Sequence, residues 1–421
     1  MNRKDNVSRG LFNAFDDVWL LDGVRTPMVD YCGALADASP TDIGIKVACE
    51  VLRRAGVPPV EIDSVLAANV APGGFDQFYL PRHIGLYAGV PTEVPALMVQ
   101  RICGSGLELF RQAGEQIAVG SARVALLVGT ESMSRHPVMA FEHRQGFRLG
   151  APVEFKDYLW ESLTDPARGI SMIHTAENLA RRHGITRGEV DAFASRSFER
   201  AVHAQQQGWF EGEIVTVASE TFELDGAQPR GLRLAGKVAS VERDTHPRLS
   251  PPEVLAKLRP VYPGGVQTGG NSAALTDAAA AAVVASGEAA RDRARPPLAR
   301  IAAAAVVGVP PEIMGIGPAP AIRLLLERTG LRLDQIARFE INEAQGAQIV
   351  AVQRELEIDP DKLNVHGGAI ALGHPLAATG VRLTVTLARQ LREAGARYGI
   401  ASACIGGGQG IALLVENADA S

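Results

Sequence analysis

The chain of 421 residues contains two similar segments that lie far apart in the sequence. In the first, a predicted helix over 105–120 opens with Ser-Gly and leads into an apolar strand at 124–128. In the second, a predicted helix over 379–395 opens with Thr-Gly and leads into a strand at 399–403. Such a wide separation is typical of duplicated half-domains rather than of a solenoid, whose repeats are shorter. The alternative is a chance likeness between two strand–helix units.

A second pair of similar runs, 63–69 and 334–342, supports the duplication. Elsewhere the chain alternates short apolar or β-branched runs with helical patterns, which predicts an α/β fold. Further strands are expected at 17–21 and 65–70, and a further helix at 41–55.

Changes in composition predict where the halves begin and end. The region 139–259 is richer in charged, aromatic and histidine residues and contains a predicted helix pair at 175–183 and 187–207, so we interpret it as an inserted domain. The charges and prolines of 286–297 are typical of a linker. The predicted parts are an N-terminal half at 1–138 that is completed by about 260–290, the insertion at 139–259, and a C-terminal half at 291–421.

Composition excludes several classes of protein. The net charge of −5 argues against a nucleic-acid-binding surface, which needs a basic patch. The apolar runs 278–285 and 301–309 are too short to span a bilayer, and 1–17 lacks the apolar core of a signal peptide. A cytoplasmic location without a membrane span is therefore expected. Four cysteines without a CxxC pair are too few for a disulfide scaffold and lack the usual zinc signature. They are Cys32, Cys49, Cys103 and Cys404.

A glycine-rich run at 364–380 surrounds the sequence Gly373-His374-Pro375. Glycine leaves room for a ligand or a second backbone to come close, and proline fixes the backbone after the histidine. Histidine is the side chain whose unperturbed pKa lies near neutral pH. The pattern therefore predicts a loop that presents an imidazole to a reacting group.

The repeat predicts which group that is. Cys103 lies just before the helix that opens at 105, and His374 lies just before the helix that opens at 379. If a pseudo-twofold axis relates the halves, both residues lie at the same ends of equivalent helices and meet between the halves. A helix N-terminus stabilises a thiolate, and a neighbouring imidazole accepts the thiol proton. The alternative for a lone cysteine is a small buried hydrophobic residue.

Two further elements carry polar chemistry. The run 404–410 follows a predicted strand, and its glycines free backbone N–H groups to act as an oxyanion hole. A phosphate-binding loop is a weaker interpretation, because no lysine follows as in a P-loop. Asn342, at the end of the strand that precedes Glu343-Ala344, either orients a water molecule or caps a helix.

These motifs, in their order and spacing, resemble the active-site motifs of the thiolase family. They are Cys103-Gly104-Ser105-Gly106, Asn342-Glu343-Ala344, Gly373-His374-Pro375 and Cys404-x-Gly406-Gly407-Gly408-x-Gly410. The resemblance extends over nearly the whole chain. It includes Arg25-Thr26-Pro27, Glu131-Ser132-Met133-Ser134, Thr175-Ala176-Glu177-Asn178, residues 255–260 and Met314-Gly315-x-Gly317-Pro318. It implies two βαβαβαββ halves stacked as five layers, with an inserted loop domain that binds coenzyme A.

The resemblance also implies roles for individual residues. Cys103 is the nucleophile that carries the acyl group as a thioester, and His374 activates it. Cys404 moves a proton to or from the α-carbon of the second acyl-CoA, or to the leaving group. Asn342, through a water molecule, joins His374 in one oxyanion hole, and the N–H groups of Cys103 and Gly406 form the other.

The residues expected to hold coenzyme A match the family only weakly. Met172, Ala273 and Arg248 occupy such positions, although a solvated surface arginine is an equal alternative for Arg248. Four departures from the family pattern are expected near the substrate cleft and bear on acyl and coenzyme A specificity. They are Ala377, Gln345, Ile173-His174 and Ala273.

The expected function is that of an acyl-CoA C-acyltransferase that catalyses reversible Claisen condensation or thiolysis of 3-ketoacyl-CoA. Coenzyme A and acyl-CoA are expected as substrates, with no permanently bound cofactor or metal. A homodimer or homotetramer is expected, and a hydratase/dehydrogenase subunit is a candidate partner. One alternative is a catalytically silent thiolase-like protein that binds acyl-CoA or lipid. Another is a decarboxylating condensing enzyme of related fold, but the presence of Cys404 favours a thiolase.

Overall fold

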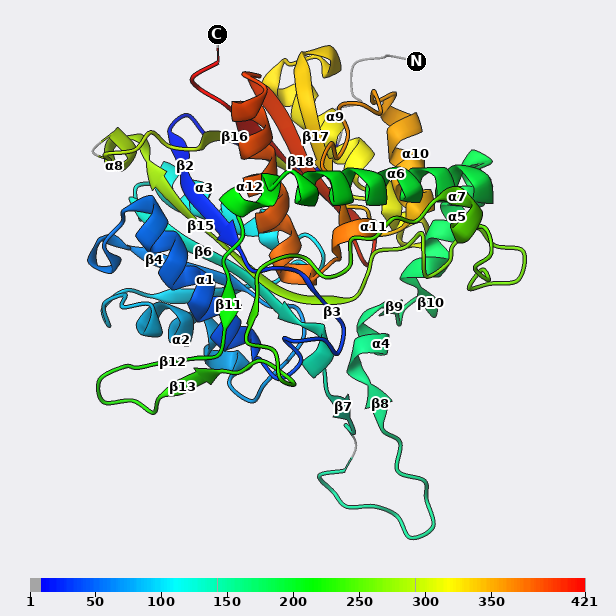
Figure 1. Cartoon of the computed structure of the whole chain (residues 1–421), viewed down its shortest axis with the longest axis horizontal. Coiled ribbons are helices and arrows are strands. Elements are labelled where there is room, and N and C mark those ends of the chain that lie inside the picture. The colour runs from blue at the N-terminus through cyan, green and yellow to red at the C-terminus, as the bar shows by residue number, and fades with distance from the viewer. Residues whose placement is uncertain (1–8, 142, 292, 421) are drawn as a thin grey trace.

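The computed structural model describes residues 9–141, 143–291 and 293–420, and a large sheet flanked by helices dominates it (Figure 1). Within these ranges the sheet has eleven strands. They are β1 (Leu11–Ala14), β2 (Val18–Arg25), β3 (Val29–Asp30), β4 (Ser64–Ala68), β5 (Ala96–Val99), β6 (Val124–Ser132), β15 (Thr276–Ser286), β16 (Ala299–Gly308), β17 (Ile336–Ile341), β18 (Tyr398–Ile405) and β19 (Gln409–Glu416).

The strand order shows the duplication directly. The path runs β5-β4-β6-β15-β2 through the first half and β17-β18-β19-β16 through the second. In each half a parallel pair, β4 with β6 or β17 with β18, is followed by two antiparallel neighbours. The halves join where β16 pairs antiparallel with β2, through Ala299 opposite Leu20 and Arg300 opposite Trp19. The predicted duplicated halves are therefore confirmed.

Helices cover both outer faces of this sheet and also fill the space between the halves. The α-helices are α1 (Pro40–Ala55), α2 (Leu80–Tyr87), α3 (Ser105–Ala118), α4 (Tyr158–Ser162), α5 (Met172–His183), α6 (Arg187–Gln206), α7 (Pro252–Leu255), α8 (Gly287–Arg291), α9 (Pro318–Thr329), α10 (Gly346–Leu356), α11 (Ala369–Leu372) and α12 (Leu376–Glu393). The 3-10 helices are η1 (Pro59–Glu61), η2 (Gln77–Tyr79), η3 (Met133–Arg135), η4 (Trp209–Gly212), η5 (Pro311–Ile316) and η6 (Leu333–Gln335).

Three separate hydrophobic clusters divide the molecule into five layers. In the first, α1 and α2 pack on the outer face of the first half, as Ile43 does against Leu126 and its neighbours. In the second, α3 and α12 lie between the two halves and bury Phe110 and Leu383. In the third, α9 and α10 pack on the outer face of the second half, with Leu325 buried. Each sheet face is thus covered by a helix layer, as an apolar face requires.

The region 139–259 adds helices and short antiparallel strand pairs to this framework. Its α5 and α6 pack against α10 of the second half and share that half's hydrophobic cluster. The pair β7 (Val138–Met139) and β8 (Lys156–Asp157) extends away from the body (Figure 1). The other pairs are β9 (Thr164–Asp165) with β10 (Ile170–Ser171), β11 (Val217–Ala218) with β14 (Ser240–Val241), and β12 (Glu220–Phe222) with β13 (Arg230–Leu232). The division of the chain at 139 and 259 stays a prediction.

Several element boundaries differ from those expected, including the start of α5 at Met172 rather than at 175 and the end of β2 at Arg25 rather than at 21. The helix predicted from 379 begins at Leu376, directly after Pro375, whose ring sets the backbone for a first helical turn. The predicted linker 286–297 contains α8, because Glu288, Ala289 and Ala290 favour a helical turn before the prolines. In the described part of the chain, no helix combines the length and apolar character needed to cross a membrane.

Candidate active site

A cavity of about 450 Å³ lies where α3 and α12 begin, between the two halves and the inserted region. Cys103 and His374 both line it, as the repeat predicts. Met172 and Ala273 line it as well, and so does Gln345. The duplication therefore brings the predicted nucleophile and the predicted base into one site.

A tight turn fixes Cys103 at the start of α3. The Ser105 hydroxyl accepts a hydrogen bond from the Arg101 N–H at 2.7 Å and donates to the Ile102 carbonyl at 2.7 Å. Ile102 adopts a φ of 46°, a left-handed conformation that is strained for a β-branched residue. Such strain is common at functional sites, where the surroundings hold it in place.

The thiol of Cys103 is buried, and the backbone N–H of Gly406 is its hydrogen-bond partner. Burial raises its pKa to about 11, although the Gly406 N–H donates a hydrogen bond to the sulfur and opposes that increase. Removing the proton therefore requires a base within the cavity, because the thiol is the stable form in the unliganded site.

His374 is held in one orientation by Thr379. Its Nδ1 lies 2.7 Å from the Thr379 hydroxyl, and that hydroxyl donates to the Pro375 carbonyl at 3.2 Å. Because the hydroxyl proton is used in this way, Nδ1–H is the donor to Thr379, and Nε2 carries the lone pair. Burial, together with a smaller effect of the Arg382 charge, lowers the His374 pKa to about 3. The imidazole is therefore neutral and able to accept a proton at Nε2.

The backbone of the histidine loop explains the glycine before it. Gly373 has a φ of 111°, and a Cβ there would lie 2.4 Å from the Thr276 side chain. The His374 N–H donates to the Ala274 carbonyl at 3.0 Å. The loop is thus pinned to the strand region that leads into β15, and only glycine fits at 373.

Cys404 lies at the end of β18, fully buried beside Met314, Ala344 and Met172. Burial raises the pKa of its thiol, and a negative charge on Cys103, when that thiol is ionised, raises it further. Two glycines of the following turn, Gly407 and Gly408, have φ values of 81° and 93°. The turn lets β19 return antiparallel while the Gly406 N–H points to Cys103.

Asn342 follows β17 and reaches the histidine. Its Nδ2 lies 3.4 Å from His374 Nε2, and among the described residues its buried Oδ1 has no hydrogen-bond partner. The residue that caps α10 is Gln345, so the helix-cap alternative for Asn342 is wrong. Its amide faces the cavity-lining imidazole instead.

Glu343, the next residue, organises the loop that leads to His374. Its carboxylate accepts hydrogen bonds from the Ser197 hydroxyl at 2.7 Å, the Asn364 amide at 2.8 Å and the Ile370 N–H at 3.1 Å. Burial raises the Glu343 pKa. The carboxyl group ties the loop before His374 to α6 of the inserted region.

The residues expected to hold coenzyme A divide into two groups. Met172 and Ala273 line the cavity, and a Cβ at Gly406 would lie 3.4 Å from the Met172 sulfur. Arg248 is exposed and does not line the cavity, and its guanidinium lies over the Phe198 ring. His246, two residues before Arg248, lines the cavity instead, because its ring turns inward and pairs with Asp30.

The expected departures from the family pattern are likewise divided. Gln345, Ile173 and Ala273 line the cavity, as expected, whereas His174 does not and makes an edge contact with the Tyr262 ring. Ala377 also lies outside the lining, which corrects its expected place in the cleft. It is the second residue of α12, and its N–H points away to donate to Glu131 at 3.2 Å.

Several residues take part in this geometry although the sequence analysis assigns them no role in the site. From sequence, Thr379 is expected only to open a helix. The one feature that could have indicated its contact with His374 is a hydroxyl group five residues after the histidine. The buried carboxylate of Glu131 accepts hydrogen bonds from the Val70, Ala71 and Ala377 N–H groups, so it joins β6 to the start of α12. His246 and Asp30 pair at 2.5 Å in the cavity wall.

The site therefore combines a thiol and a neutral imidazole that line the cavity, Cys103 and His374, with a second, fully buried thiol and a backbone N–H group behind the lining, those of Cys404 and Gly406. A thiol and an imidazole provide a nucleophile with its base, and a second thiol provides a separate acid or base. In the ranges that the structure describes, no three His, Cys, Asp or Glu side chains gather into a group that could hold a metal ion.

Comparisons with known proteins agree with this chemistry. The family models "Thiolase, N-terminal domain" and "Thiolase, C-terminal domain" match residues 18–288 and 295–417. The chain is 41% identical to the mitochondrial 3-ketoacyl-CoA thiolase of Bos taurus over 402 residues, which cover 95% of this chain and 98% of that protein. It is 39% identical to the acetyl-CoA acetyltransferase of Syntrophomonas wolfei, covering 95% and 99%. The crystal structure of human mitochondrial 3-ketoacyl-CoA thiolase in complex with CoA superposes with a TM-score of 0.88 at 40% identity, covering 95% and 98%.

Proposed function

The chain belongs to the thiolase family and is an acyl-CoA C-acyltransferase, and we propose that it cleaves 3-ketoacyl-CoA with coenzyme A through an acyl-thioester on Cys103. The same steps in reverse give Claisen condensation of two acyl-CoA molecules. The relatives are named 3-ketoacyl-CoA thiolase and acetyl-CoA acetyltransferase, which are both names of enzymes. Nothing therefore favours the alternative of a silent acyl-CoA-binding protein.

The first step is the acylation of Cys103. His374 Nε2 takes the thiol proton as the sulfur attacks the 3-keto carbon, and a C–S bond forms. The bond between C2 and C3 then breaks, and the electron pair passes to the departing acetyl-CoA enolate. The neutral state of both groups supports this order, because burial disfavours a standing thiolate–imidazolium pair.

Cys404 completes the carbon–carbon step. Its thiol gives a proton to C2 of the enolate, and acetyl-CoA leaves. The resulting Cys404 thiolate accepts the proton of the incoming coenzyme A thiol, whose sulfur attacks the thioester and releases acyl-CoA. His374 returns its proton to Cys103. The raised pKa of the Cys404 thiol suits this role, because a strong base is needed to remove a proton from an α-carbon in the reverse direction.

Two groups of hydrogen-bond donors stabilise the negative oxygens of these steps. The N–H groups of Cys103 and Gly406 face the tetrahedral intermediate, and a water molecule held by Asn342 acts with His374 on the enolate oxygen. Donors fixed in a buried site need no reorganisation as charge develops, so they stabilise the transition state strongly. Asn342 Oδ1 has no hydrogen-bond partner in the part of the chain that the structure describes, which supports the proposed position of the water molecule.

Met172, Ala273 and Arg248 are proposed to contact coenzyme A; the first two line the cavity, and Arg248 is exposed outside the lining. The solved structure of a relative with CoA supports coenzyme A as a substrate. A cytoplasmic location, a homodimer or homotetramer, and a hydratase/dehydrogenase partner remain predictions from sequence.

The observation that carries the proposal is the convergence of Cys103 and His374 on one cavity, with the Gly406 N–H on the sulfur. Assays of thiolysis and condensation across acyl chain lengths test it, together with a mass spectrum of the protein after incubation with acyl-CoA. The wild type is expected to carry an acyl group on the peptide that contains Cys103, and Cys103→Ala none. The same acylated peptide in the Cys103→Ala protein would refute the assignment.

A further inference from the structure

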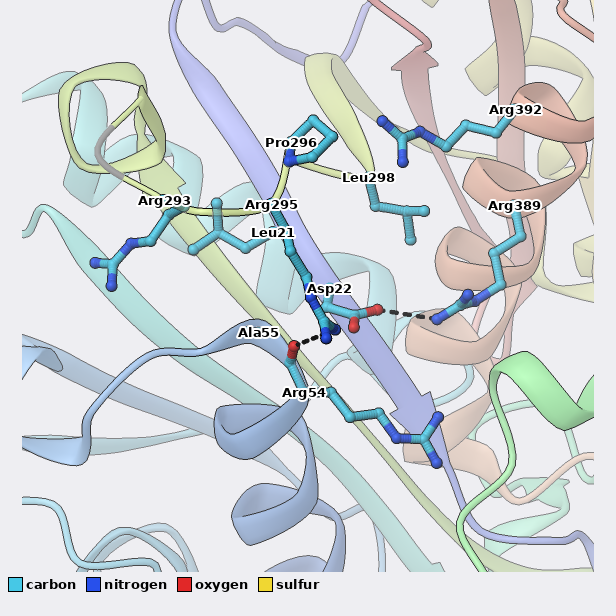
Figure 2. A pocket seen from close by; sticks show the side chains of 10 residues that line it. All are labelled: Leu21, Asp22, Arg54, Ala55, Arg293, Arg295, Pro296, Leu298, Arg389 and Arg392. Atoms are coloured by element: carbon cyan, nitrogen blue, oxygen red, sulfur yellow. Dashed lines mark hydrogen bonds and ion pairs between the residues drawn. The ribbon is translucent and has the colours of Figure 1, made fainter.

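A second cavity, of about 240 Å³, lies where the two halves join and is lined by arginines (Figure 2). The five arginines are Arg54, Arg293, Arg295, Arg389 and Arg392. Asp22 is the one acidic residue among the ten described residues that line this cavity. No step of the proposed mechanism uses this cavity.

Three segments that are distant in sequence supply these arginines. Arg54 lies in the last turn of α1, Arg389 and Arg392 lie near the C-terminal end of α12, and the other two lie between α8 and β16. The catalytic cavity lies at the opposite end of α12, which rises by about 1.5 Å per residue, so the two cavities are roughly 20 Å apart. The arginine cavity is therefore separate from the acyl-transfer site.

The ion pairs around this cavity leave an excess of positive charge. Four of its arginines each pair with a carboxylate: Arg54 with Glu50, Arg293 with Glu61, Arg389 with Asp22, and Arg392 with Asp419. Glu50 also pairs with Arg53, outside the cavity. Six arginines thus share four carboxylates among the described residues, which leaves an excess of two positive charges.

Two of the guanidinium groups have donors to spare. Arg295 is exposed, and its contact within the described ranges is a hydrogen bond to the backbone carbonyl of Arg54 at 3.3 Å. The Nε of Arg389 is buried and has no hydrogen-bond partner among the described residues, although its Nη2 binds Asp22 at 2.9 Å. In Figure 2 the Arg389 side chain points toward Asp22.

We propose that this cavity binds a compact polyanion of the phosphate class, of which pyrophosphate is the simplest example. Planar guanidinium groups match phosphate oxygens with paired N–H donors, and arginine remains charged at any physiological pH. A ligand with at least two negative charges balances the excess of two. A bound polyanion connects α1, the segment before β16 and α12, so it stabilises the junction of the halves.

Titration of the full-length protein with sodium pyrophosphate, followed by calorimetry and by thermal unfolding, tests the proposal. The wild type is expected to bind and to unfold at a higher temperature with the ligand, because a ligand that binds only the folded state stabilises it. Sodium chloride at the same ionic strength is expected to give no comparable increase. Arg295→Ala is expected to weaken binding at least about tenfold, since a hydrogen bond between charged groups is lost.

Arg332→Ala is the matched control, because Arg332 is also exposed and lies in an ion pair with Asp334 away from this cavity. It is expected to bind pyrophosphate as the wild type does. Thiolysis by Arg295→Ala is expected to be unchanged. A failure of pyrophosphate binding therefore does not count against the proposed acyl-enzyme, and a failure to form the acyl-enzyme does not count against the arginine cavity. No binding by the wild type, unchanged binding by Arg295→Ala, or an equal loss in both variants would overturn the proposal.

Discussion

Gly106 of α3 and Gly380 of α12 are in direct backbone contact. A Cβ at Gly380 would lie 2.2 Å from the Leu107 nitrogen, and a Cβ at Gly106 would lie 2.7 Å from the Val381 nitrogen. The two glycines occupy equivalent positions of the duplicated halves. Their contact brings the starts of the two helices together and so places Cys103 and His374 on the same cavity.

Gly380→Ala is expected to destabilise the fold by about 1–3 kcal/mol, because the added methyl group meets backbone that has no rotamer with which to move away. The helix starts must separate, so acyl-enzyme formation is expected to fall as well. Urea unfolding and mass spectrometry of the acylated protein measure the two effects.

Gly188→Ala serves as the control, because Gly188 lies in α6 and a Cβ there meets nothing within 4 Å. A helical glycine in open space is stabilised by alanine, by about 0.5–1 kcal/mol. Equal effects of the two substitutions would show that the contact between the helices has no special importance.

Cys404→Ala is expected to separate the two chemical stages. Cys103 keeps its hydrogen bond from Gly406, so acyl-CoA still acylates the protein. The α-proton of acetyl-CoA is no longer removed, so condensation is expected to fall by about 10²–10⁴-fold, the usual contribution of a general acid or base. Deuterium exchange at the α-carbon, measured beside acylation, distinguishes the stages. Normal condensation by this variant would rule out the role of Cys404.

Thr379→Val is expected to reduce kcat more than it changes KM. Valine keeps the shape of the side chain but removes the oxygen that receives the His374 Nδ1–H. The imidazole then loses the group that fixes its tautomer, and a buried N–H is left unpaired at a cost of about 1–3 kcal/mol. The pH profile of kcat is expected to change with the tautomer, which a purely structural defect would not produce.

Thr384→Val is the matched control for that experiment. Thr384 is also buried in α12, but its hydroxyl donates to the Gly380 carbonyl within the helix and not to the histidine. Its substitution is expected to leave the pH profile unchanged. If both variants lost activity in the same way, Thr379 would have no particular role in orienting His374.

The sequence was sufficient to predict that Cys103 and His374 lie on the same cavity, because duplication places equivalent helix ends together. It was not sufficient to place Ala377, which is near His374 in sequence but not in the cavity. The first turn of α12 directs its N–H to Glu131 instead. A change of three residues in the predicted helix start decides that orientation, and sequence patterns locate helix ends poorly.

The orienting role of Thr379 was missed for the same reason. With α12 beginning at Leu376, Thr379 lies within the first turn, and its hydroxyl faces back to the histidine. No sequence pattern predicts the arginine cavity. Its residues come from three segments that only the packing of the two halves brings together.

Burial of His374 predicts a specific loss of stability in acid. Its pKa is about 3 in the folded protein, against 6.5 for the unperturbed side chain, so the unfolded state binds more protons between these values. The free energy of unfolding therefore increases with pH through this window, by at most about 1.4 kcal/mol per pH unit from this group. Glu340 acts in the opposite sense, because its pKa is raised to about 7 by burial and its stabilising proton is lost as the pH increases.

Comparing the wild type with His374→Asn removes the contribution of Glu340, since Glu340 is present in both proteins. Reversible urea unfolding is expected to show that the change in the free energy of unfolding from pH 5 to pH 7.5 is shifted to a more negative value in the variant, by about 1–2 kcal/mol. An equal difference in both proteins would mean that His374 is not held neutral by burial, and the proposed transfer of the Cys103 proton to a neutral imidazole would then fail.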